Sequence, residues 1–305
     1  MKAGKKVVLF AFLANLSIAL VKLFVFLISR SSSMFSEAIH SFVDTGNQIF
    51  LLIGISKSQR KEDKSHQFGY SKESFFWAYL VAVQLFTLGG LYSIYKGIQK
   101  ISHKEPLENI FYVIILIIFS MLAENFSFQK ARKVIDSVKG ELSYFEYIKK
   151  SINPEIIVVF LEDLAAMISL SIALLFVLLY WITKNPIFDG IGSVFIGLIL
   201  LIAGFIIGGE TRSLLIGEAA PEEMQRFIEK VIKSHRGVER LIYVKSMVLG
   251  SDSILIAGKV DFNDNLNADE IGEVIDEIEN EIRAKHPEIK KIYLEPDTYQ
   301  SNKKP

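Results

Sequence analysis

Six long runs of apolar residues occupy the N-terminal part of the chain. They cover residues 7–28, 34–55, 75–97, 109–128, 154–182 and 187–208. A helix of about 20 apolar residues crosses the hydrocarbon core of a bilayer, so each run predicts one membrane-spanning helix. The first run follows a basic stretch, as a signal peptide does, but it is too long and no small-residue cleavage site follows it. We expect all six spans to be retained.

The pattern changes after the sixth run. Residues 221–234 and 268–284 have the spacing of amphipathic helices, whereas residues 238–249, 253–262 and 289–294 alternate or cluster as strands do. This α-β-β-α-β order predicts a small α+β domain with its helices on one face of a sheet. The expected fold is therefore an all-α six-helix transmembrane bundle at residues 1–208, followed by a ferredoxin- or metallochaperone-like α+β domain at residues 209–305.

Composition narrows the possible functions. The chain has 34 Lys+Arg and 34 Asp+Glu, yet 50% of its residues are hydrophobic and its mean hydropathy is +0.34. The charges are segregated, because residues 209–305 contain 14 basic and 19 acidic side chains. An acidic tail argues against a nucleic-acid partner. The absence of cysteine from the sequence excludes disulfides, thiolate metal sites and a cysteine nucleophile.

Loop charges predict the orientation of the spans. Lys and Arg are held on the cytoplasmic side of short loops, and basic residues concentrate before span one, after span two and after span four. Both termini and the acidic tail should then be cytoplasmic. Because only a short basic leader precedes span one, we expect a multi-pass protein of a bacterial cytoplasmic membrane.

Span two contains a stripe of polar residues. Its members follow one another at spacings of three, four, three and one, which places them on one face of a helix: Glu37, His40, Asp44, Asn47 and Gln48. Ionisable groups at membrane depth cost several kcal/mol unless they are partnered, and so indicate function. The stripe should face the interior of the bundle. Spans four and five add Glu124 and Asn125, and Glu162 and Asp163.

These residues suggest a cation site. His40 and Asp44 lie one turn apart, close enough to ligate one small cation, and Asp163 is a candidate second carboxylate from span five. Lys22, the basic residue deepest in a span, lies toward one end, so the buried acid needs another cation. Glu162 projects about 100° from Asp163. It is a ligand, a proton carrier or a contact to another helix, and Glu124 is a further candidate.

Taken together, these features resemble the cation diffusion facilitator family of metal exporters. The resemblance covers nearly the whole chain and includes six spans, the H-x-x-x-D of span two, an acidic span five, an H-x-F-G segment at 66–69 and the α-β-β-α-β tail. The segments SEAIHS (36–41), GISKS (54–58) and LEDLAA (161–166) are similar to the branch that contains the animal mitochondrial zinc transporter.

The resemblance implies a homodimer that exchanges divalent metal for protons by alternating access. It implies a transport site between spans two and five, where His40, Asp44 and Asp163 match three of the four usual ligands. The fourth position is Val159, which cannot coordinate metal. Glu162, Glu124, Asn47 or water must complete the site. One imidazole among oxygen ligands suits zinc and also admits manganese, cobalt or iron(II).

The family's accessory sites depart from the pattern. Asp63 and His66 fit a metal site in the loop after span two, but Tyr70 stands where a second histidine is often found. In the tail, Tyr243 and Lys259 replace the histidines that bind zinc at the dimer interface. His235 and His286 fall elsewhere and are expected at the surface. The tail should therefore dimerise without sensing metal.

The function expected from these features is proton-coupled efflux of a divalent metal, with zinc foremost. Metal binds deprotonated carboxylates and neutral imidazole, so metal and protons compete for one site. No enzymatic activity and no prosthetic group are expected; the partners are a second copy, metal ions, protons and the bilayer. The alternatives are an intramembrane metal-dependent hydrolase, which lacks the H-E-x-x-H pattern, and a non-transporting scaffold, which leaves the span-two stripe without a purpose.

Overall fold

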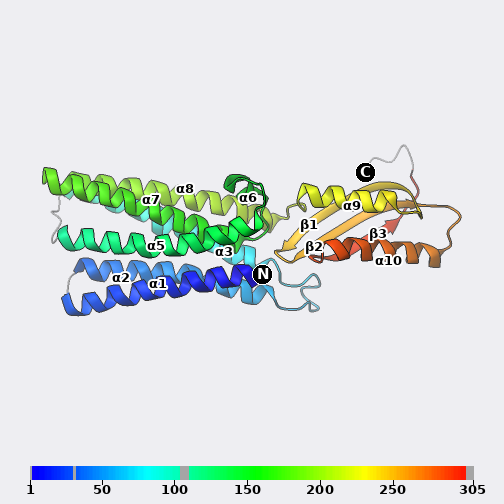
Figure 1. Cartoon of the computed structure of the whole chain (residues 1–305), viewed down its shortest axis with the longest axis horizontal. Coiled ribbons are helices and arrows are strands. Elements are labelled where there is room, and N and C mark those ends of the chain that lie inside the picture. The colour runs from blue at the N-terminus through cyan, green and yellow to red at the C-terminus, as the bar shows by residue number, and fades with distance from the viewer. Residues whose placement is uncertain (1, 30–31, 104–109, 300–305) are drawn as a thin grey trace. The chain divides into compact units, whose positions relative to one another are not determined.

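The computed structural model describes residues 2–29, 32–103 and 110–299, and leaves the side chains of residues 32–40, among others in the first two helices, outside the description. The chain forms two compact units (Figure 1). One comprises residues 1–59 and 73–212, and the other comprises residues 60–72 and 213–305.

The first unit is helical. Its elements are α1 (Lys2–Ser29), α2 (Ser32–Ser58), α3 (Glu73–Gln84), the π-helix η1 (Leu85–Leu91), α4 (Tyr92–His103), α5 (Ile110–Val138), α6 (Tyr144–Lys150), α7 (Pro154–Thr183) and α8 (Ile187–Ile216). Here α3, η1 and α4 follow one another without a break, so the predicted third span is one helix with a π-helical turn inside it. The short helix α6 was not predicted from the sequence.

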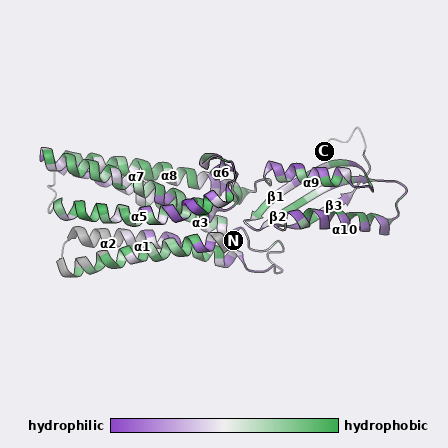
Figure 2. Ribbon diagram, viewed as in Figure 1, coloured by the Kyte–Doolittle hydropathy of each residue, from purple (hydrophilic) through white to green (hydrophobic). Residues whose placement is uncertain are grey.

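Among the described residues, five helices are long and apolar enough to cross a membrane: α1, the continuous helix at Glu73–His103, α5, α7 and α8. Figure 2 shows apolar residues predominating along α5, α7 and α8. These five helices coincide with five of the six predicted spans. The sixth, α2, is 27 residues long, but its polar stripe lowers its hydropathy. The count of six spans therefore stays a prediction.

Close backbone contacts join α8 to the helix formed by α3, η1 and α4. A Cβ atom added at Gly197 would lie 2.7 Å from the carbonyl oxygen of Gly90, and one added at Gly97 would lie 2.7 Å from that of Gly190. Glycines at these positions let the two backbones approach more closely than any larger residue would allow.

The second unit contains a three-stranded sheet. Its elements are α9 (Glu222–Ser234), β1 (Val238–Gly250), β2 (Ser253–Phe262), α10 (Ala268–Lys285) and β3 (Ile289–Pro296). They follow the predicted order, and each bound lies within two residues of the expected one. The strand order is β1-β2-β3, with β1 and β2 antiparallel and β2 and β3 parallel.

Burial in the second unit explains why these residues form a sheet with one covered face. Alternate residues of β2, including Ile254, Ile256 and Val260, are fully buried, and the residues between them are half-buried.

Asn267 begins α10 with a capping box, since its side chain accepts from the backbone N–H of Glu270 while the Glu270 carboxylate accepts from the Asn267 N–H.

Residues 60–72, which connect α2 to α3, belong to the second unit. Lys291 forms an ion pair with Glu62 at 2.6 Å, and its ammonium lies 5.5 Å from the centre of the Phe68 ring. Lys72 donates a hydrogen bond to the carbonyl of Leu215 at 3.1 Å. The expected domains, 1–208 and 209–305, placed this loop with the spans, because long-range contacts of a loop leave no trace in hydropathy.

The contact at Gly197 predicts a specific loss of stability. In Gly197→Ala, the new methyl group meets the backbone of Gly90 and Ile94, and overpacking of this kind costs about 1–3 kcal/mol. Thermal unfolding of the purified protein in detergent should show a lowered midpoint. Gly209→Ala is the matched control on the same helix, because a Cβ there meets nothing within 4 Å. An equal loss in both variants would contradict the close helix contact.

Candidate metal-binding site

The polar stripe of α2 faces the interior of the first unit. The side chains of Asn47 and Gln48 are 2% and 0% exposed, and Asp44 is half-buried. The predicted inward orientation of the stripe is therefore confirmed for these residues. The side chains of Glu37 and His40 lie outside the described part of the structure, so the pairing of His40 with Asp44 stays a prediction.

Helix α7 places two adjacent carboxylates in the same interior. Glu162 is 8% exposed and Asp163 is 1% exposed. Both lie about a third of the way along a helix that begins with a proline at its first position, where the missing N–H is not needed. Val159, one turn before Asp163, is fully buried in the apolar core and offers no ligand.

Glu162 faces α2. Its Oε1 accepts a hydrogen bond from Asn47 Nδ2 at 2.6 Å, and its Oε2 accepts one from Gln48 Nε2 at 3.1 Å. Asp44 lies close enough to interact electrostatically with the same carboxylate. Of the roles that the sequence left open for Glu162, the structure supports a place beside the α2 stripe.

Asp163 instead faces α5. Glu124 and Ser127 lie beside it, and Glu162 is close enough to repel it. One of its carboxylate oxygens, Oδ2, is buried without a hydrogen-bond partner among the described residues, as are the side-chain carbonyl oxygens of Asn47 and Gln48. Buried acceptors nearly always have a partner in native proteins, so these oxygens are available to a hydrogen-bond donor, such as water, or to a cation.

The described residues supply no positive charge to these carboxylates. No Lys, Arg or His among them acts on Glu162 or Asp163, whose charged neighbours are Asp44 and Glu124. Within the same described part of the chain, no three His, Asp or Glu side chains gather as a metal cluster. The side chain of His40 lies outside that part of the chain. The complete ligand set predicted from the sequence is thus untested, whereas the acidic centre between α2, α5 and α7 is observed.

The loop after α2 brings Asp63 and His66 together. Asp63 Oδ1 accepts hydrogen bonds from the backbone N–H groups of Ser65 and His66 at 2.9 and 2.8 Å, and lies 3.6 Å from His66 Nδ1. Asp63 Oδ2 accepts a hydrogen bond from the Tyr70 hydroxyl at 2.5 Å. These bonds, that of Tyr70 foremost, lower the pKa of Asp63 to about 2. Hydrogen-bond donors of the loop itself therefore occupy both oxygens of the Asp63 carboxylate.

In the tail, the two residues expected in place of zinc-binding histidines are cross-strand partners. Tyr243 of β1 is in register with Lys259 of β2. Lys259 lies between two carboxylates, at 3.1 Å from Glu295 and 2.8 Å from Asp297. Hydrogen bonds to Asp297 and then Glu295 raise the pKa of Lys259. The Lys259 ammonium thus offsets part of the negative charge of Glu295 in β3 and of Asp297 just after it.

The expectation that His235 and His286 are surface residues is wrong. Their side chains are only 15% and 21% exposed, and each pairs with a glutamate, at 3.1 Å and 3.0 Å. His235 reaches Glu277 and so connects the end of α9 to α10. His286 also contacts the ring of Phe227, with ring centres 5.2 Å apart. The sequence pattern missed them because both follow helices whose packing was not known.

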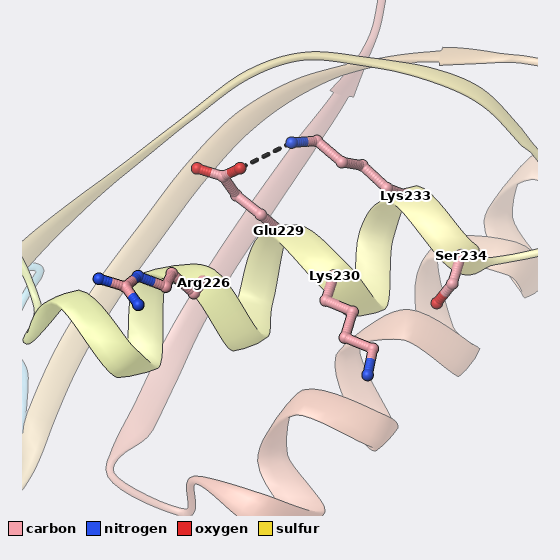
Figure 3. A pocket seen from close by; sticks show the side chains of 5 residues that line it. All are labelled: Arg226, Glu229, Lys230, Lys233 and Ser234. Carbon is pink, nitrogen blue, oxygen red and sulfur yellow. Dashed lines mark hydrogen bonds and ion pairs between the residues drawn. The ribbon is translucent and has the colours of Figure 1, made fainter.

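A shallow hollow on α9 carries no functional arrangement (Figure 3). Lys233 pairs with Glu229 at 2.7 Å, one helical turn away, while the side chain of Lys230 points away from that pair. Arg226 pairs with Glu222, also one turn away. Pairs of this kind are usual on a solvated helix face and contribute little to stability.

Comparison with known proteins identifies the chain's family. Residues 8–216 match the family model described as the cation efflux transmembrane domain. The chain belongs to the cation diffusion facilitator family. The observed acidic centre and the spans around it all lie within the matched region of this family.

Several family members are similar over most of this chain. The mouse and clawed-frog (Xenopus laevis) mitochondrial proton-coupled zinc antiporters SLC30A9 are each 29% identical over 97% of it. Metal tolerance protein C4 of Arabidopsis thaliana is 30% identical over 85% of this chain. The matched region makes up 57% of that relative's length. The chain spans about three fifths of the length of the antiporters, at 59% and 60%. The names of the two SLC30A9 relatives describe transporters.

The loop geometry predicts how Tyr70→Phe behaves. Loss of the phenol removes the strongest donor to Asp63, so the pKa of that carboxyl should rise toward its ordinary value of 3.8. Because the folded pKa is lowered, the stabilising contribution of the carboxylate is present above the unfolded value and is lost as the pH falls through about 2. The variant should lose it at a higher pH.

Hydrogen exchange of the loop peptide, followed by mass spectrometry from pH 7 to pH 3, measures this effect. The amides of Ser65 and His66 should exchange faster in Tyr70→Phe, and increasingly so below pH 4. Tyr293→Phe is the control, since Tyr293 is 55% exposed in β3. Unchanged protection in Tyr70→Phe would show that the phenol does not hold the loop.

Proposed function

We propose that this protein exports divalent metal cations, zinc foremost, in exchange for protons. The observation that carries the proposal is the burial of Glu162 and Asp163 between α2, α5 and α7, with no basic partner among the described residues. The similarity to proteins named as proton-coupled zinc antiporters supports it.

The physical basis is competition between metal and protons. A buried carboxylate without a counter-charge is costly, so it is stable only when it is protonated or when it binds a cation. Loading of a divalent metal then releases protons, and protonation expels the metal. If the two faces of the bundle open in turn, a proton gradient drives metal in the opposite direction.

The proposed ligands come from two helices. His40 and Asp44 contribute from α2, and Glu162 and Asp163 contribute from α7, where Glu162 takes the place that Val159 leaves vacant. Asn47 and Gln48 hold Glu162 in position through both of its oxygens. Outer partners of this kind orient ligands in metal sites. One imidazole among oxygens accepts zinc and also manganese, cobalt or iron(II).

The remaining features of the proposal follow from loop charge and from the family. Both termini and the second unit are placed on the cytoplasmic side, the protein acts as a homodimer, and protons and metal ions are its substrates. Glu124, beside Asp163, is proposed to share protons with it rather than to complete the metal site. A hydrolytic activity has no support in the relatives that are named as proton-coupled zinc antiporters.

Removal of either carboxylate should strongly reduce coupled exchange. In proteoliposomes, Glu162→Gln and Asp163→Asn should each lower zinc-dependent proton flux at least about tenfold, since weakened metal sites lose 10- to 100-fold in affinity or activity. Flux is read with a pH dye inside the vesicles while zinc is added outside. The panel of zinc, manganese, cobalt, iron(II) and cadmium then defines metal preference.

Glu146→Gln and Asp276→Asn are the controls, because they make the same chemical changes at exposed positions of α6 and α10. Both should retain wild-type flux. Normal zinc transport by both Glu162→Gln and Asp163→Asn would reject the proposal.

A further inference from the structure

An apolar groove lies within the first unit, between α5, α6, α7 and α8. It has a volume of about 550 Å³. Its floor is hydrocarbon, with Phe128 from α5, Leu164 from α7 and Ile206 from α8 among the lining residues. The groove is separate from the acidic centre, because neither Glu162 nor Asp163 lines it.

The groove is built rather than incidental. Phe160 stacks against Phe128 on one side and Tyr144 on the other, with ring centres 5.2 and 5.6 Å apart. Tyr144 is in turn fixed by its hydroxyl, which donates to Asp136 at 2.7 Å and accepts from Arg132 at 3.0 Å. Aromatic contacts and hydrogen bonds from three helices therefore hold this wall in place.

Helix α6 has the pattern of a helix that lies at a membrane surface. Its sequence is YFEYIKK, and it begins with a capping box between Ser143 and Glu146. Tyr147 and Ile148 are buried, while Phe145 is 65% exposed next to the Lys149 ammonium, 4.6 Å from its ring centre. Aromatic and basic residues side by side are typical of the headgroup region of a bilayer.

Charge distinguishes one end of the groove. Arg132 and Lys149 line it there, together with Glu210. The segment from 130 to 150 carries six basic residues and three acidic ones. Basic pockets between membrane helices on the cytoplasmic side bind the headgroups of anionic lipids.

We propose that this groove binds an anionic phospholipid, with one acyl chain over Phe128, Phe160 and Ile206 and the phosphate held by Lys149 and Arg132. A hydrocarbon floor on membrane-spanning helices fits an acyl chain, and the excess of basic charge at one end fits an anionic headgroup. The acyl chain of a zwitterionic phospholipid would fit the apolar floor equally well, but its headgroup would place a positive charge beside Lys149. The inference does not depend on the transported ion.

Lipid binding to the purified full chain tests the inference. Protein stripped of lipid in a neutral detergent is titrated with dioleoyl phosphatidylglycerol or dioleoyl phosphatidylcholine, and bound lipids are counted by native mass spectrometry. The wild type should retain the anionic lipid at lower concentration than the zwitterionic one. Lys149→Gln should weaken binding of phosphatidylglycerol about fivefold, the effect of one basic residue near a charged lipid.

Two matched variants make the result specific. Lys150→Gln removes the same charge from the next residue, which does not line the groove, and should change binding less than about twofold. Ile206→Trp fills the groove from a residue that is 37% exposed, and should lower binding of phosphatidylglycerol without lowering the thermal unfolding midpoint in lipid-free detergent.

Three results would overturn the inference. Equal losses in Lys149→Gln and Lys150→Gln would indicate general surface charge rather than this groove. Equal retention of both lipids by the wild type would show that the basic side chains do not select an anionic headgroup. A change in the proportion of dimer in Ile206→Trp, with lipid binding intact, would show that a second copy of the chain covers the groove.

Discussion

Two neighbouring carboxylates buried in one helix are the constraint on which the first unit depends. Glu162 and Asp163 follow one another on α7, so their side chains diverge and meet different helices. Glu162 is held by two amide groups of α2, and Asp163 lies against the polar side of α5. If α2 or α5 presented an apolar face to α7 here, one of the two carboxylates would be buried without a polar partner. The free-energy cost of such a buried charge exceeds that of any single packing defect.

This constraint explains why polar and close-packed regions are separated in the first unit. Polar residues of α2, α5 and α7 gather around the carboxylates. Helix α8 instead meets the helix of α3, η1 and α4 through glycines, with backbones in contact at Gly90 and Gly97. Contacts of that type need no charge and tolerate no added methyl group. The acidic centre thus lies among α2, α5 and α7, whose polar side chains provide oxygen atoms. The closely packed apolar contact between α8 and the helix of α3, η1 and α4 lies elsewhere in the unit.

Hydropathy and periodicity predicted most of the fold. Five spans begin within five residues of their expected starts, but α5 and α8 continue ten and eight residues past their expected ends, whereas all five elements of the tail lie within two residues of their expected bounds. Each of these elements buries a face whose pattern is visible in the sequence. The π-helical turn at Leu85–Leu91 and the short helix α6 were missed. A pair of glycines is the only local sign of the π-helical turn. The seven residues of α6 are too few to show a clear helical periodicity.

The candidate site was predicted in its members but not in its pairing. Membrane depth marked Asp44, Asn47, Glu162 and Asp163 as functional, and a helical wheel showed that Glu162 and Asp163 diverge. The prediction joined Asp163 to the residues of α2, whereas in the structure Glu162 contacts α2 and Asp163 lies beside α5. Which carboxylate faces α2 depends on the rotation of α7 against its neighbours. The amide groups of Asn47 and Gln48 decide this rotation, and their partner was not recognisable from spacing alone.

The loop at 60–72 shows a connection that local pattern does not reveal. Helix α2, which carries the polar stripe, ends at Ser58, and the chain then enters a segment tied to the second unit by Glu62 and Lys72. Asp63 closes this segment with hydrogen bonds from Ser65, His66 and Tyr70, so it is internally braced rather than extended. A braced loop has few conformations to lose when it contacts a partner, so such contacts cost less conformational entropy than those of an unstructured loop. The end of the helix that carries the site is therefore connected to the second unit by a short segment with its own fixed structure.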